Sequence, residues 1–327
     1  MVQRASAVSQ ATEQTIFQCN YCHYTDYAPV INNIRDWEYG VTGSYDYYQC
    51  SHCEGVQLNP FPNLEDLKLA YDIDYHGYAE GQKRGLLFSA LYAAKEKLFR
   101  RHMRKFVNPS SKVLDVGCGA GDFLDNMQSL GVSRLEGIDF SQEMIDKLNA
   151  RGITGHCGTF PQFDAEFQSY DLISMNNYLE HTLTPVQELE KSFDLLRCGG
   201  HLVGEVPGFD SWERRLFGRY WGGNHVPRHT YQFNTDFLYK ILQSAGYQDI
   251  QISHQLNTGH WALSVQNFLQ RKAPDLKHNP AISSGRSRVY VPMLLLFIPI
   301  NIFCVLMRKS GCIKFTAQKP LANSDHD

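Results

Sequence analysis

The sequence predicts an α/β protein built on a doubly wound, largely parallel sheet. The first evidence is the stretch from Lys112 to Phe140, in which a short apolar strand breaks into a glycine turn, a helical pattern begins at Asp122, and a second strand follows. Strand and helix patterns then alternate, with strands at 155–159, 170–175 and 201–206 and helices at 142–151 and 185–197. Such alternation places the strand carboxyl ends at one edge of the sheet, where we expect a ligand.

The turn after the first strand has glycine at every second position, Gly117, Gly119 and Gly121. Glycine allows positive φ and close approach of a ligand to the backbone, and the helix that follows offers unpaired N–H groups at its start. Asp115 precedes the first glycine by two residues. Asp139 ends the second strand about twenty residues downstream, where a carboxylate can accept hydrogen bonds from both ribose hydroxyls. The pattern predicts a nucleotide-cofactor site.

The spacing of the glycines narrows the choice of cofactor. A dinucleotide fingerprint reads G-x-G-x-x-G and accommodates an anionic pyrophosphate, whereas the acid before the first glycine here suits a ligand with a cationic amino group. VLDVGCGAGDFL and GIDFSQEMI resemble the first two motifs of class I S-adenosylmethionine-dependent methyltransferases. The resemblance implies S-adenosylmethionine as cofactor and a Rossmann-like methyltransferase sheet. A dinucleotide enzyme and a degenerate, non-binding fold are the alternatives.

The resemblance also implies roles for single residues. Asp115 would bind the amino-acid end of the cofactor and Asp139 its ribose, while Thr159 and Phe160 lie where the adenine rests. Phe140 and Asn176, which lie at strand ends, complete the expected cofactor-binding set together with the three glycines of the turn.

Composition limits the partners and the compartment. A chain of 327 residues is long enough for two domains or for one α/β domain with appendages. A net charge of −3 and a pI near 6.5 give no overall attraction to nucleic acid. The start of the chain is polar, without the apolar core of a secretory signal, so we expect a cytoplasmic protein whose nine cysteines form no disulfides.

The N-terminal segment predicts a metal site. Residues 1–15 are expected to be a disordered leader, and 16–62 a zinc ribbon. Its two CxxC pairs place two thiolates each on a tight turn and together complete a tetrahedral structural zinc site, formed by Cys19, Cys22, Cys50 and Cys53. The alternative is four reduced cysteines without metal.

After the ribbon we expect a helical connector over 63–110, a methyltransferase core over 111–260, an insertion over 261–309 and a closing strand over 310–320. The insertion contains nineteen uncharged residues, 289–307, nominally enough to cross a bilayer. Two prolines interrupt them, basic residues flank both ends, and the closing strand must return to the sheet. We therefore expect two short helices that dip into the cytoplasmic membrane surface, with burial against the domain itself or a partner chain as the alternative.

The strand expected at 170–175 runs into Asn176-Asn177-Tyr178-Leu179-Glu180-His181. This element and LLRCGGHLVGEVP resemble the family again. In ubiquinone-pathway O-methyltransferases the similar element reads Glu-x-x-Glu-His and holds a divalent metal, but here Asn177 replaces the first glutamate. Glu180 and His181 are therefore expected to cap a helix and pack beneath the cofactor, and a catalytic metal held by them is the alternative.

The segment 221–233 resembles the W…PxHxxxF stretch of a bacterial methyltransferase group with an N-terminal CxxC…CxxC module, often encoded with surface-polysaccharide or secondary-metabolite pathways. His229 first and His225 second are the expected general bases, because a neutral imidazole suits a hydroxyl or ammonium acceptor. The alternative for each is a hydrogen bond within the loop.

The predicted function is methyl transfer to a glycan, lipid-linked or secondary-metabolite acceptor. One alternative is an RNA methyltransferase, because some rRNA enzymes also carry a zinc ribbon. The acidic pI and NNYL in place of an (N/D)PPY motif argue against it. The other is a non-catalytic cofactor-binding protein that uses the ribbon for docking.

Overall fold

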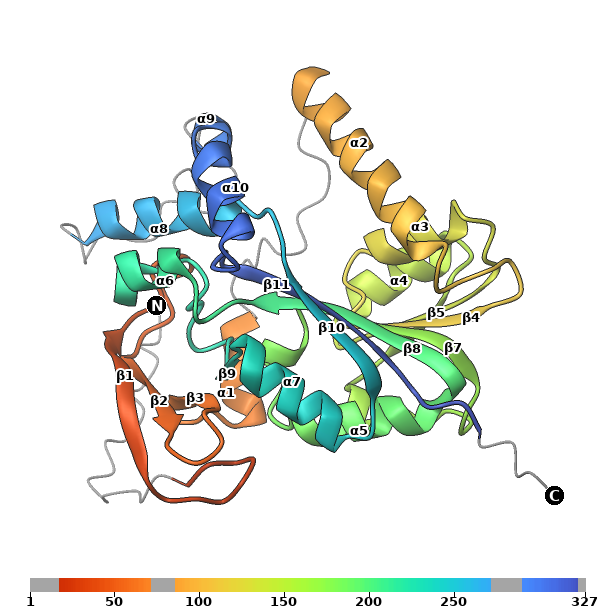
Figure 1. The fold of residues 1–327 in the computed structure, drawn as a ribbon, viewed down its shortest axis with the longest axis horizontal. Coiled ribbons are helices and arrows are strands. Elements are labelled where there is room, and N and C mark those ends of the chain that lie inside the picture. Colours follow the sequence, from red (N-terminus) through yellow and green to blue (C-terminus); the bar gives the residue numbers. More distant parts are fainter. Residues whose placement is uncertain (1–17, 72–85, 272–289, 323–327) are drawn as a thin grey trace, which may run out of the picture.

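A seven-stranded sheet forms the centre of the computed structural model, which describes residues 18–71, 86–271 and 290–322 (Figure 1). The strand order is β10-β11-β8-β7-β4-β5-β6. The bounds are β4 Lys112–Val116, β5 Arg134–Asp139, β6 Thr154–Cys157, β7 Tyr170–Asn176, β8 Leu196–Pro207, β10 Gln248–His254 and β11 Cys312–Gln318. Strands β4 to β8 pair in parallel, and the predicted doubly wound sheet is confirmed.

Helices cover both faces of this sheet because its central strands, β4 and β7, are buried on both sides. Val113 and Leu114 are consecutive and fully buried, and they belong to two different apolar clusters. The helices packed around the sheet are α2 Leu86–Met103, α3 Asp122–Gln128, α4 Gln142–Ala150, α5 Pro185–Leu195 and α7 Thr235–Ser244. The Ser141 and Asn234 side chains cap α4 and α7 by accepting hydrogen bonds from backbone N–H groups in the first turn.

The closing strand returns to the sheet as the sequence predicts. β11 lies between β10 and β8 and runs antiparallel to both. Its register with β8 is unbroken from Cys312 opposite Pro207 to Gln318 opposite His201. The carboxyl end of β8 is therefore held in place from both sides, by β7 and by β11.

The ribbon segment forms a second sheet that continues into the core. Three of its strands come from the N-terminal segment, β1 Tyr27–Ile34, β2 Tyr45–Cys50 and β3 Val56–Asn59, and α1 Leu64–Tyr71 follows them. The fourth strand, β9 Tyr231–Gln232, belongs to the loop after β8 and pairs with β3. Cys19 and Cys53 also lie in the same apolar cluster as Phe237 of α7. The ribbon and the core thus share one packed interior.

The remaining helices gather at one end of the molecule (Figure 1). They are α6 Trp212–Phe217, α8 Gly259–Gln270, α9 Tyr290–Leu296 and α10 Ile298–Leu306. The short 3-10 turn η4 Gly218–Tyr220 packs against α6 and α8, and the turns η2 Phe160–Gln162 and η3 Leu179–His181 lie in other loops. Helices α9 and α10 cover most of the predicted uncharged segment and are separated at Phe297, two residues before Pro299. Across the described ranges, every helix is too short or too polar to cross a membrane. The predicted leader, 1–15, and residue 289 lie outside those ranges.

Candidate functional site

The glycine turn between β4 and α3 has the backbone that the sequence predicts. Gly117, Gly119 and Gly121 have φ values of 70°, 48° and 84°, in the left-handed region where a side chain is strained. A Cβ on Gly117 would lie 2.6 Å from a ring carbon of Tyr178. Side chains at Gly117 and Gly121 would therefore clash with their neighbours. The N–H groups of Gly117, Gly119 and Gly121 already donate hydrogen bonds to Ile138, Asp139 and Cys118, which fixes the turn.

Asp139 joins this turn to the end of β5. One carboxylate oxygen accepts a hydrogen bond from the Gly119 N–H and the other from the Ser141 N–H, both at 2.9 Å. Burial raises the pKa of Asp139, and the backbone hydrogen bonds oppose that shift. Phe140 follows with 45% of its surface exposed, and its ring lies 5.0 Å from that of Tyr71. An acid and an exposed aromatic ring thus border the turn on the β5 side.

Asp115 lies beneath the turn at the end of β4. Its carboxylate accepts a hydrogen bond from the Ser174 hydroxyl of β7, and burial raises its pKa to about 7. The other predicted cofactor residues differ in exposure. Asn176 ends β7 and is half-buried, Thr159 bonds to the Gln162 side chain, and Phe160 is buried in the apolar core.

A second polar cluster lies where β7 ends. Glu180 and His181 form part of η3, His229 comes from the loop before β9, and one ligand atom of each lies within 4.8 Å of the other two. Glu180 is 1% exposed, and neither of its carboxylate oxygens has a hydrogen-bond partner within the described part of the chain.

Each of the two histidines in this cluster has a hydrogen-bond partner at its Nδ1 atom. The Nδ1 atom of His181 lies 2.6 Å from the Tyr71 hydroxyl, and Nδ1 of His229 lies 2.9 Å from the Gly223 carbonyl oxygen. Each ring therefore keeps Nε2 for another partner. The Nε2 atom of His181 lies 4.0 Å from a Glu180 carboxylate oxygen.

Burial determines the charges in this cluster. It raises the pKa of Glu180 to about 8, with a smaller contribution from the nearby Glu205 carboxylate. It lowers the pKa of His181 to about 3 and that of His229 well below its ordinary value. Both imidazoles are therefore neutral near pH 7. Glu180 is mostly protonated at that pH, so a divalent cation held by the two imidazoles and Glu180 would have to displace the carboxyl proton.

The prediction that Glu180 and His181 cap a helix is wrong. The next helix, α5, begins at Pro185 after Thr184, and neither Glu180 oxygen accepts a hydrogen bond from its first turn. The acid that bonds near this helix start is Glu188, which accepts from the hydroxyls of Thr182 and Thr184. The 3-10 turn of η3 directs Glu180 inward instead.

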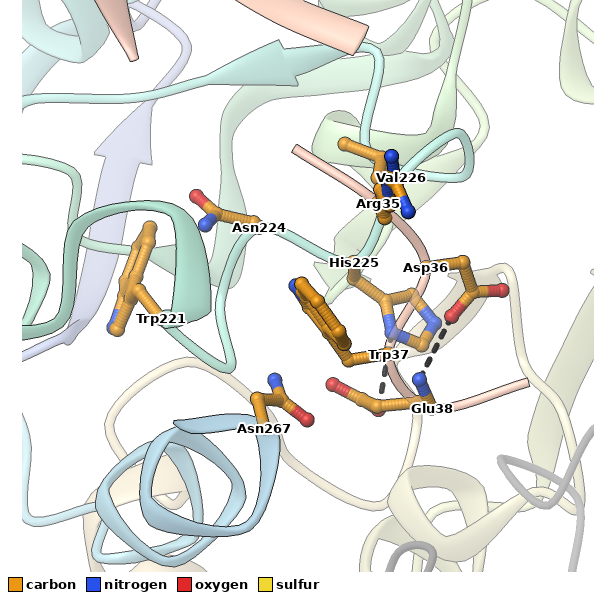
Figure 2. Close-up of a pocket in the computed structure, with 9 residues that line it drawn as sticks. All are labelled: Arg35, Asp36, Trp37, Glu38, Trp221, Asn224, His225, Val226 and Asn267. Carbon is orange, nitrogen blue, oxygen red and sulfur yellow. Dashed lines mark hydrogen bonds and ion pairs between the residues drawn. The ribbon is translucent and has the colours of Figure 1, made fainter. Parts of the chain in front are cut away.

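His225 joins the cluster from the same loop as His229. Its ring lies 5.0 Å from that of His229 and 6.2 Å from that of His181. Its Nδ1 atom lies 3.3 Å from a Glu38 carboxylate oxygen, and Figure 2 shows how Trp37 and Glu38 face it from the ribbon segment. Sequence reasoning missed Glu38 and Tyr71, because no local pattern relates them to histidines so far along the chain.

The four ribbon cysteines meet as the spacing predicts. Cys19 Sγ lies 3.5 Å from Cys53 Sγ, Cys22 Sγ lies 3.5 Å from Cys50 Sγ, and all four sulfur atoms lie within 4.8 Å of one another. Four thiolates around one zinc ion with bonds of about 2.3 Å stand roughly 3.8 Å apart. The arrangement therefore fits a closed tetrahedral site.

Comparison with known proteins identifies a methyltransferase domain in the chain. Residues 90–252 match the family model described as a methyltransferase domain. An uncharacterized 37.1 kDa protein in transposon TN4556 of Streptomyces fradiae is 33% identical over 110 residues, which is 32% of each chain.

Two further relatives have named activities. Ubiquinone biosynthesis O-methyltransferase of Proteus mirabilis is 29% identical over 38% of this chain and 54% of its own. A tRNA U34 carboxymethyltransferase of Shewanella denitrificans is 31% identical over 36% of this chain and 38% of its own. The chain thus spans between about a third and about half of the length of these three relatives.

Solved structures that align with this chain include a SAM-dependent methyltransferase from Archaeoglobus fulgidus, at 16% identity and a TM-score of 0.46 over 71% of this chain and all of that one. The [4+2]-cyclase SpnF aligns at 18% identity and a TM-score of 0.46 over 78% of this chain and 92% of its own.

Proposed function

We propose that this chain, which carries an S-adenosylmethionine-dependent methyltransferase domain over residues 90–252, transfers the methyl group of that cofactor to a hydroxyl group of a glycan, lipid-linked or secondary-metabolite acceptor. The observation that carries the proposal is the juxtaposition of two sites. The glycine turn with Asp139 lies beside the Glu180, His181 and His229 cluster, and Tyr71 contacts both the Phe140 ring and His181. A net charge of −3 argues against a nucleic-acid acceptor.

The residues of the turn fit S-adenosylmethionine. The three glycines adopt the positive φ that the family's cofactor turn requires, Asp139 suits the ribose hydroxyls, and Asp115 suits the cationic amino group. The exposed face of Phe140 offers an apolar surface beside the ribose position. When bound, the cofactor supplies an electrophilic methyl group for in-line displacement, so the protein contributes mainly by positioning the acceptor.

The histidine cluster supports a role in activating the acceptor. We assign Glu180, His181 and His229 to a divalent cation that would hold the acceptor oxygen, because the Glu180 oxygens accept no hydrogen bond among the described residues and one ring nitrogen of each histidine lies within 4.8 Å of a Glu180 oxygen. His225, held by Glu38 through Nδ1, is the imidazole placed to receive the proton of the acceptor. In this proposal His229 is a ligand of the cation, whereas the sequence analysis expects it to be the first general base.

We also propose that the four ribbon cysteines hold one structural zinc ion. Their sulfur atoms leave no open coordination position, so the ion would stabilise the fold and take no part in chemistry. Three of the four cysteines are buried, and they pack in the same apolar cluster as Tyr231 and Phe237 of the core.

Replacement of Asp139 by alanine, or of Gly119 by arginine, should abolish S-adenosylmethionine binding while the fold persists. The first change removes the acceptor for the ribose hydroxyls, and the second fills the turn at a residue with φ of 48°. Isothermal titration calorimetry measures the affinity, and circular dichroism checks the fold. The matched control is Asp146→Ala on the exposed side of α4, which should bind as the wild type does. Wild-type affinity in both turn variants would exclude this cofactor site.

Cys50→Ser should remove one zinc ion per chain and lower the melting temperature of the whole protein, because the ribbon and the core share one interior. Elemental analysis of protein purified without chelator gives the metal content, and calorimetry the melting temperature. Cys157→Ser is the control, since Cys157 is exposed and outside the cluster. Wild-type protein without zinc would contradict the structural site.

Mn²⁺ should bind at one site per chain, distinct from the cysteines, because this hard cation prefers imidazole and carboxylate ligands over thiolates. Glu180→Gln and His229→Asn should each weaken binding at least about tenfold. Mn²⁺ binding is measured as the loss of the six-line electron paramagnetic resonance signal of free Mn²⁺ during a titration. This measurement needs no methyl acceptor.

The matched control for this titration is Glu213→Gln. Glu213 is also fully buried, and its carboxylate oxygens also lack a side-chain or backbone hydrogen bond among the described residues, but it lies on α6. It should bind Mn²⁺ as the wild type does. If Glu180→Gln also does, the assigned ligand set is wrong.

A further inference from the structure

We propose that helices α6, α8, α9 and α10 form a surface that binds an anionic lipid bilayer. These four helices pack together at one end of the molecule (Figure 1). We call their outward side chains the bilayer-facing surface. The inference goes beyond methyl transfer, and binding to lipid does not depend on it.

Large apolar side chains dominate this surface. Leu216 of α6 is 69% exposed, Leu296 of α9 is 72% exposed and Leu306 of α10 is 74% exposed. Other exposed apolar residues on the same four helices or next to them are Phe268, Leu269, Leu295, Ile300, Ile302, Phe303 and Met307. Single exposed leucines are normal on soluble proteins, but a group of this size on adjacent helices marks an interaction site.

In helix α10 the polar side chain is buried and apolar side chains are exposed, which is the reverse of a helix that faces water. Its one polar side chain, Asn301, is fully buried, and Asn301 Oδ1 accepts a hydrogen bond from the Asn257 N–H at 3.0 Å. Ile302 and Phe303, which follow it, are about half exposed. A water-facing helix of a soluble protein places its apolar residues inside and its polar residues outside. The exposed side of α10 is therefore suited to an apolar medium.

Aromatic contacts hold the two short helices firmly in this orientation. The Phe297 ring stacks on Trp261 of α8 at 5.3 Å, and Phe303 lies 5.5 Å from Trp212 of α6. Helix α10 is nine residues long, which gives a length of about 13 Å, far less than the bilayer core. Helices of this length can lie in the headgroup region but cannot span the bilayer.

Charge on the same helices identifies the partner. The sequence of α6, α8, α9 and α10 contains one acid, Glu213, and its side chain is fully buried. Arg215 of α6, Arg219 of η4 and Arg308 after α10 are exposed, and the ion pairs found within the described ranges include none of the three. An apolar surface with exposed arginines and without exposed acids complements anionic lipid headgroups. A symmetric contact between two copies would instead bring the arginines of both close together.

The bilayer-facing surface adjoins the candidate acceptor site. His260 of α8 contacts the Trp221 ring at 5.7 Å, and the Ser264 hydroxyl accepts a hydrogen bond from the Gly222 N–H at 2.9 Å. Both partners belong to the loop that carries His225 and His229. Docking would therefore bring this loop to the membrane surface. If the proposed methyl transfer holds, the acceptor is lipid-linked.

Vesicle flotation with the full chain tests this surface. Wild-type protein should float with vesicles of phosphatidylcholine and phosphatidylglycerol and much less with phosphatidylcholine alone. The Leu296→Glu and Leu306→Glu double variant should lose at least about tenfold in lipid partitioning, because two exposed apolar contacts become charges. Arg215→Gln with Arg219→Gln should lose roughly fivefold per arginine on anionic vesicles.

The matched control is Leu69→Glu with Leu321→Glu, which adds the same charge at two comparably exposed leucines elsewhere, at 66% and 70%. It should float as the wild type does. The proposal is overturned if the wild type does not float with anionic vesicles, or if the α9 and α10 double variant floats equally well. A wild-type dimer that this variant converts to a monomer, without vesicle binding, would identify the surface as a protein interface instead. Cofactor affinity, measured separately, reports on methyl transfer whatever the flotation result.

Discussion

The buried ion pair between Arg228 and Asp36 is the constraint on which the candidate site depends. Arg228 is fully buried, its guanidinium lies 3.1 Å from an Asp36 carboxylate oxygen, and it donates a second hydrogen bond to the Ala70 carbonyl at 2.6 Å. The same group lies 4.4 Å from the centre of the Tyr39 ring. A buried charge that loses its partner destabilises a protein by about 3–5 kcal/mol. The loop that carries His225 and His229 is therefore fixed to the ribbon and to α1.

Further contacts extend this coupling through the site. The Tyr47 hydroxyl of β2 lies within hydrogen-bond distance of the carbonyl oxygens of Asn224 and His229, at 2.9 and 2.8 Å. Glu38 holds His225, and β9 continues the ribbon sheet directly after the loop. The ribbon therefore forms part of the wall of the site. A metal that orders the cysteines would also order the loop, although the ion itself lies outside the chemistry.

Local patterns in the sequence predicted the parts of this site that lie close together along the chain. The glycine turn, Asp139 and each CxxC pair follow from spacing within one or two elements, whereas the closing strand follows from the resemblance to the methyltransferase family. The partners of the histidines do not. Arg228 and Asp36 are 192 residues apart, and no short pattern relates them. The predicted cap by Glu180 failed for a related reason, because a 3-10 turn in place of an immediate helix directs the carboxylate into the interior. The role of His229 likewise depends on the Gly223 carbonyl that bonds to its Nδ1 atom, which only the folded loop reveals.

The central claim is that the protein methylates an acceptor held at a membrane surface. The most direct measurement incubates the full chain with methyl-tritiated S-adenosylmethionine and a bacterial cell extract, and then separates organic-soluble from aqueous products. The account predicts tritium in an organic-soluble product with the wild type, and none with Asp139→Ala. Labelled product in the aqueous phase alone would contradict the membrane-held acceptor, and absence of any labelled product would contradict methyl transfer itself.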